Sequence, residues 1–173
     1  QEAEESQPTE EYKRKINTVA NALRKYLFGL GLSDVDLVTQ NVIDYTDTRD
    51  PTTGVGDISI VEGTESQGEN SRRVITLAME IYDPNLSEAE LEQRLASVLN
   101  HEIIHAMRGL GLFTDAEFAM LVKAAEKRKY VKRSGGRNVE REYTFLDRAE
   151  HMYPDESAEV QQEEAVAEMF RAY

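Results

Sequence analysis

The stretch from Ser87 to Gly109, SEAELEQRLASVLNHEIIHAMRG, decides how this chain folds. Ser87 followed three residues later by Glu90 forms a capping box, which opens a helix, and Gly109 marks where that helix should end. The apolar residues of the stretch recur at three- and four-residue spacing and form one stripe: Leu91, Leu95, Val98, Leu99 and Ala106. The pattern therefore predicts a long helix with a buried face.

Polar residues interrupt this buried face. Glu102 and His105 fall within the stripe, and a buried carboxylate without a partner costs several kcal/mol or becomes protonated. A zinc ion beside it would remove most of that cost. Ile103, Ile104 and Met107 predict a second apolar face on the opposite side, so we expect the helix to lie sandwiched in the interior.

Residues His101 to His105 have the sequence HEIIH, which matches the motif HExxH. Two histidines four residues apart lie about 40° apart around a helix, so both imidazoles can bind one zinc ion. Glu102 lies between them and can act as the base that activates a water on the metal. Because the chain has no cysteine, any further ligand must be a histidine or a carboxylate.

A catalytic zinc normally has three protein ligands and a water, so a third ligand is needed. The extended pattern HExxHxxGxxH is excluded, because Arg108 and Gly111 stand where it requires Gly and His. The remaining candidates are His151, Asp115 and the acidic residues of the C-terminal helix. The histidine pair alone does not decide among them.

We favour Glu164 as the third ligand, because it opens the segment ExxAE. In that segment Ala167 is small enough to let the C-terminal helix approach the HExxH helix closely. Glu168, one turn on, could accept the second ring N–H of a ligand histidine and fix its orientation. Glu163 is the rival ligand, since it lies on the apolar side of the helix between Val160 and Phe170.

These motifs resemble the gluzincin class of zinc peptidases, in which HExxH lies on one helix and a glutamate ligand, in ExxAE, ExxxD or a similar motif, on a later helix. HEIIHAMRGLGLFTDAEF followed by EEAVAEMF is also similar to metallopeptidase domains embedded in the large polyvalent proteins of phages and other mobile elements. The resemblance implies a zinc-dependent metallopeptidase with Zn²⁺ as cofactor, a protein or peptide as substrate, and a place within a larger polypeptide. Glu168 stands where many members of the class carry Asp.

The same resemblance implies further parts of the site. Gluzincins add a Tyr or His that stabilises the oxyanion, and the candidates here are Tyr143, His151 and Tyr153. The strand that precedes the metal helix, residues 74–82, would form the edge of the cleft and pair with an extended peptide.

The rest of the chain predicts an α+β, zincin-like fold: a small mixed sheet with a backing helix, the central HExxH helix and a C-terminal ligand helix. Residues 1–9 read as a disordered acidic tail and residues 10–173 as one zincin-like domain. Residues 62–70 read as a loop, and residues 139–154 are ambiguous. The helices are expected at residues 10–30, 114–129 and 156–173 besides the metal helix, and the strands at 35–44, 57–61 and 74–82.

The composition narrows the classes of partner. The chain has 173 residues and a net charge of -13, so it would repel nucleic acid. It has no apolar run of the roughly 18 residues that a membrane span needs and no signal peptide, so we expect a cytoplasmic protein without a membrane partner. A basic run over residues 127–137 reads as a solvated helix end and loop. Two alternative functions remain: an inactive zincin-like protein-binding module, and a zinc hydrolase of a non-peptide bond.

Overall fold

The computed structural model describes residues 9–40, 45–47, 58–60, 63–68, 72–78, 85–134 and 137–171. The expected acidic tail falls almost entirely outside these residues. The described elements, in chain order, are α1 (Glu10–Gly29), β1 (Val35–Gln40), β2 (Tyr45–Asp47), β3 (Ile58–Ile60), β4 (Gly63–Gln67), β5 (Arg73–Ala78), α2 (Glu88–Gly109), α3 (Asp115–Lys127), β6 (Lys129–Ser134), β7 (Arg137–Thr144), α4 (Phe145–Met152) and α5 (Ala158–Arg171). The expected α+β class is confirmed.

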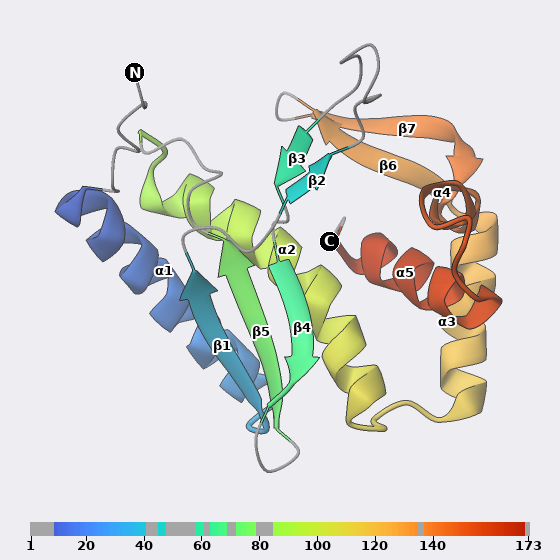
Figure 1. Cartoon of the computed structure of the whole chain (residues 1–173), viewed down its shortest axis with the longest axis horizontal. Coiled ribbons are helices and arrows are strands. Elements are labelled where there is room, and N and C mark those ends of the chain that lie inside the picture. The colour runs from blue at the N-terminus through green and yellow to red at the C-terminus, as the bar shows by residue number, and fades with distance from the viewer. Residues whose placement is uncertain are drawn as a thin grey trace.

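The main sheet has the strand order β1-β5-β4. β1 runs parallel to β5, while β4 runs antiparallel to β5, so the sheet is mixed. Helices α1 and α2 lie together behind the strands (Figure 1). Ile75 and Leu77 of β5 are fully buried in the same cluster as the apolar sides of both helices, because β5 is paired on both edges and the helices cover the face that carries these two side chains.

The main sheet corrects two expectations. Residues 62–70 were expected to form a loop, but β4 lies within them and pairs with β5. The strand expected at 74–82, observed as β5, is therefore the middle strand and does not form the edge of the cleft; residues 79–82 lie outside the described part. The sequence of β4, GTESQ, is polar because an edge strand needs no continuous apolar pattern.

The segment between α3 and α5 holds an antiparallel hairpin, β6 with β7, followed by the short helix α4. β7 is exposed along nearly its whole length, so it lacks the apolar alternation that predicts a strand. α4 begins at a complete capping box formed by Thr144 and Asp147. The ambiguous residues 139–154 are thus the second strand of the hairpin and the helix that follows it.

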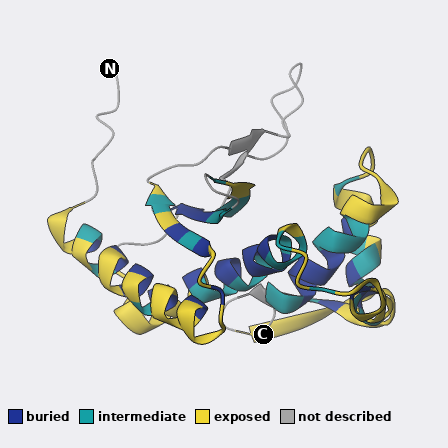
Figure 2. Cartoon of the chain, turned by 90° about the horizontal axis from the view of Figure 1, so that it is seen from below, coloured by how far each residue is buried: buried dark blue, intermediate teal, exposed yellow. Residues whose placement is uncertain are grey.

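The long helix α2 lies between two hydrophobic clusters. The first joins α2 to α1, β1 and β5, and the second joins Ile104 to α3, α4 and α5. Figure 2 shows buried residues along the helices in the middle of the molecule and exposed residues on the outer side of α1. The expected second face is narrower than predicted, because Ile103 and Met107 belong to the first cluster. Ile103 follows Leu99 of the stripe by one turn, and Met107 follows Ile103 by one turn, so both widen that stripe.

The ends of α2 lie where the sequence predicts, and the Ser87 half of the capping box is present. The Ser87 side chain accepts a hydrogen bond from the backbone N–H of Glu90 at 3.2 Å. At the other end Gly111 has a φ of 67°, the left-handed conformation that glycine adopts readily after a helix. None of the described helices is long and apolar enough to cross a membrane.

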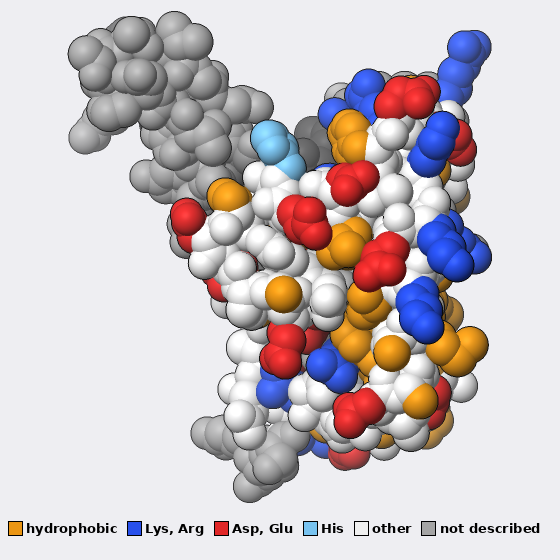
Figure 3. Space-filling view, turned by 90° about the vertical axis from the view of Figure 1, so that its right-hand side faces the viewer, with side chains coloured by type: hydrophobic (Ala, Val, Ile, Leu, Met, Phe, Trp, Pro, Cys, Tyr) orange, Lys and Arg blue, Asp and Glu red, His pale blue; other side chains and the backbone are white. Residues whose placement is uncertain are grey.

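The face over α3 and α4 carries acidic, basic and apolar side chains intermixed (Figure 3).

Candidate metal centre

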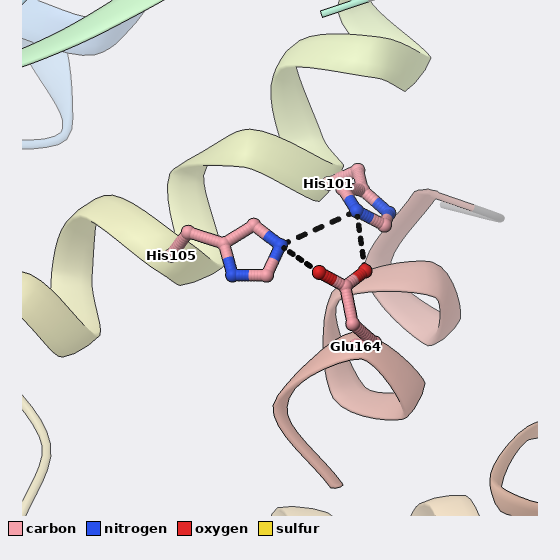
Figure 4. A group of neighbouring side chains, drawn as sticks. All are labelled: His101, His105 and Glu164. Atoms are coloured by element: carbon pink, nitrogen blue, oxygen red, sulfur yellow. Dashed lines mark hydrogen bonds and ion pairs between the residues drawn. The ribbon is translucent and has the colours of Figure 1, made fainter. Parts of the chain in front are cut away.

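Three side chains converge where α2 and α5 pack together. Figure 4 shows His101 and His105, on successive turns of α2, pointing at Glu164 of α5. The two Nε2 atoms are 3.3 Å apart, and each is 3.3 Å from a different carboxylate oxygen of Glu164. The two helices approach closely because Ala165 and Ala167 of α5 are small and fully buried.

The other ring nitrogens of both histidines bind carboxylates of α5. Nδ1 of His101 lies 2.9 Å from Oε2 of Glu168, and Nδ1 of His105 lies 2.7 Å from Oε1 of Glu163. A carboxylate can only accept, so each Nδ1 carries the hydrogen and donates it. In the neutral ring the proton-free Nε2 then directs its lone pair toward Glu164.

The resulting donor set fits a small divalent cation. Two imidazole nitrogens and a carboxylate oxygen lie within 4.8 Å of one another, and the 3.3 Å between the two Nε2 atoms matches the donor spacing around a tetrahedral ion. With bonds of about 2.0–2.1 Å, as zinc makes to histidine, such donors lie about 3.3–3.4 Å apart. Lone pairs facing each other at this distance repel unless a cation lies between them.

The electrostatics of this cluster also favour a cation. Burial alone would lower the pKa of His105, but hydrogen bonds with Glu163 and Glu164 outweigh it and raise the pKa to about 10. Burial is likewise outweighed at His101, whose bonds with Glu164 and Glu168 raise its pKa. The same contacts hold the pKa of Glu164 far below its ordinary value despite its burial. In the metal-free protein, protons supply the positive charge.

Glu102 lies beside the cluster and lines the same cleft. The residue is 7% exposed, and burial raises its pKa, although the two histidines act in the opposite direction. The backbone of β4 presses close to it: a Cβ on Gly63 would lie 2.7 Å from Cγ1 of Val98 and 3.4 Å from Cγ of Glu102. A glycine is needed here, because any side chain would collide with α2.

The cleft has a volume of about 990 Å³ and is lined by residues of β4, β5, α2, α4 and α5 and of the segment between α4 and α5. Of the three candidates for oxyanion stabilisation, only Tyr153 lines it. Burial raises the pKa of Tyr153 to about 12, so its hydroxyl keeps its proton at neutral pH. Tyr143 stacks on Tyr130, and His151 is exposed outside the cleft.

The structure separates the candidates for the third ligand. Glu164 faces both Nε2 atoms, whereas Glu163 occupies Nδ1 of His105. Asp115 and His151 are exposed and do not line the cleft.

Sequence reasoning did not identify the arginines around the cluster. Nε of Arg108 lies 3.6 Å from Glu163, and Nε of Arg171 lies 3.6 Å from Glu168. Across the cleft, Arg73 forms a two-point ion pair with Glu65 of β4. A sequence signal existed for one pair, since Glu168 and Arg171 are three residues apart on one helix.

Comparison of the chain with protein-family models, with curated proteins and with solved structures finds no match. The resemblance to gluzincins therefore remains a prediction that rests on HEIIH and the acidic C-terminal helix.

Proposed function

We propose that this chain is a zinc-dependent metallopeptidase with a zincin-like fold. His101, His105 and Glu164 would hold the ion, and Glu102 would act as the general base. The observation that carries the proposal is the convergence of both Nε2 atoms and the Glu164 carboxylate at 3.3 Å, with each Nδ1 already bound to another carboxylate. A backing helix, a mixed sheet, the HExxH helix and a later ligand helix are the order expected of such a fold.

Held by His101, His105 and Glu164, a zinc ion would supply Lewis acidity, which would polarise a scissile carbonyl and make water more acidic. Glu102 takes the proton of the attacking water at its carboxylate and later gives it to the leaving amine. Its burial suits this exchange, because burial raises the pKa of Glu102 and so favours the protonated form that it reaches after taking the proton. Tyr153 donates its hydroxyl hydrogen to the oxygen that gains negative charge.

A peptide substrate is supported by the position of β4. Among the described strands β4 pairs with β5 alone, so no described strand occupies its other edge. Gly63, Thr64 and Glu65 of this strand line the cleft that holds the metal cluster. An extended peptide can add to such an edge through backbone hydrogen bonds and so lie alongside the catalytic groups.

The proposal is tested first by metal content. Purified wild-type protein should hold one zinc per chain by elemental analysis. His105→Ala and Glu164→Ala should lose it, while Glu102→Gln should keep it. Glu159→Ala is the matched control on α5, because Glu159 is exposed and outside the cleft. Circular dichroism of each variant checks that it is folded.

Activity separates the peptidase from its alternatives. The wild type should cleave an unfolded protein such as casein, and Glu102→Gln should cleave it at least about 100-fold more slowly. Zinc binding without cleavage of any peptide would contradict the peptidase assignment and leave a hydrolase of another bond. A wild type that binds no zinc even after addition would leave only a protein-binding domain.

A further inference from the structure

Four arginines line the cleft: Arg73, Arg108, Arg148 and Arg171. Three of them form ion pairs, with a nitrogen within 4.0 Å of a carboxylate oxygen. The pairs are Arg73 with Glu65, Arg108 with Glu163, and Arg171 with Glu168. The Arg73 pair joins β5 to β4 in the wall of the cleft. The other two pairs contact Glu163 and Glu168, the carboxylates that orient the histidines. Among the described residues, Arg148 has no carboxylate within that distance, so its charge is not used by such a pair.

Arg148 is held in place by an aromatic ring. Its guanidinium carbon lies 4.8 Å from the centre of the Tyr130 ring. Tyr130 is itself buried, with Phe145 packed edge-on at 5.5 Å and Tyr143 stacked at 5.8 Å. A guanidinium over a fixed ring loses little further freedom when it binds a ligand, and it keeps its N–H donors for a carboxylate.

The net charge of the cleft favours binding of an anion. Five carboxylates and four arginines line it. With both histidines neutral and one divalent ion bound, the cleft would carry a single net positive charge, although the whole chain carries -13. Arg148 is the cleft arginine that forms no ion pair with a carboxylate of the described residues, although its charge acts at longer range on Glu168. A negative group entering the cleft would therefore find a positioned and largely preorganised partner.

We propose that Arg148 binds a carboxylate of the peptide substrate and makes cleavage selective for peptides that carry one near the scissile bond. This inference rests on the proposed peptidase function, because it assigns the cleft to a peptide. The carboxylate can come from an acidic side chain or from the free C-terminus of the peptide. Both present the same two oxygens to a guanidinium, so the experiment must distinguish them.

The test uses quenched fluorescent peptides in matched pairs. In one pair a Glu near the scissile bond is replaced by Gln, and in the other a free C-terminus is replaced by an amide. We expect the wild-type kcat/KM to be about 10- to 100-fold higher for the carboxylate member of one pair. The pair that shows the preference identifies the source. Arg148→Gln should abolish the preference while keeping zinc content and cleavage of the uncharged peptide, and Arg148→Lys should restore part of it.

A binding experiment keeps this inference separate from the peptidase proposal. In the Glu102→Gln background, anisotropy of labelled peptides should show tighter binding of the carboxylate member, with the difference lost in Arg148→Gln. The control is Arg141→Gln, an exposed arginine of β7 outside the cleft. Equal binding of both members by the parent, or a preference that survives Arg148→Gln, would overturn the role of Arg148. Preferential binding without any cleavage would instead contradict only the peptidase proposal.

Discussion

Removing the Glu163 carboxylate should weaken zinc binding although Glu163 does not face the metal position. Its oxygen lies 2.7 Å from Nδ1 of His105, a length typical of a charge-assisted hydrogen bond. Loss of such an orienting carboxylate generally weakens metal binding 10- to 100-fold, which corresponds to about 1.4–2.7 kcal/mol. We therefore expect Glu163→Ala to raise the zinc Kd by about 10- to 100-fold. Glu163→Gln keeps an oxygen acceptor without the charge, so its effect should be smaller.

The assay is competition for zinc against a fluorescent chelator at neutral pH, with Glu159→Ala as the control on the same helix. Thermal unfolding of the metal-free variants measures how much of the loss is structural, since Arg108 also loses its neighbouring carboxylate in Glu163→Ala. A Kd for Glu163→Ala within about twofold of wild type, against the expected 10-fold or more, would refute the idea that this hydrogen bond orients His105.

Three further predictions concern the ion, pH and packing. Zinc at 100 times its Kd should stabilise the fold by about 2.7 kcal/mol, seen as a rise in Tm that His105→Ala abolishes. In chelator-treated protein, His105 has a folded pKa of about 10 against an ordinary 6.5. Protonated His105 therefore stabilises the folded state fully below pH 6.5, and this stabilisation is lost as the pH rises toward about 10. The denaturant concentration at the midpoint of unfolding should fall over the same pH range. A midpoint that does not change with pH would contradict this prediction. Gly63→Ala should destabilise the fold by about 1–3 kcal/mol in chemical denaturation, and adding Val98→Ala should recover part of the loss if the clash with that side chain is the cause.

The two helices that carry the metal cluster, α2 and α5, could be predicted from sequence because their signals are local. Ser87, the apolar stripe and Gly109 bound α2 within one residue of its observed ends. The choice of Glu164 over Glu163 came from motif spacing, since the apolar pattern of α5 pointed to Glu163. The observed packing of α5 on α2 is what turns Glu164 toward both Nε2 atoms.

The parts that the sequence did not predict depend on contacts between distant segments. β4 has no apolar alternation, and only its pairing with β5 makes it a strand and places it over Glu102. Arg73 and Arg108 reach the cleft from different elements, so no local pattern in the chain points to them. Tyr153 could not be chosen over Tyr143 and His151 until the cleft was defined.

Because α2 lies between the two hydrophobic clusters, an ion bound at its histidines would connect the two clusters. The histidines belong to a helix whose buried stripe packs with α1 and the sheet, whereas Glu164 belongs to a helix packed in the second cluster. An ion bound by all three would act as a reversible cross-link between halves of the core that are otherwise joined through one helix. Substitutions deep in either half, far from the donors, would then alter how long the ion stays bound.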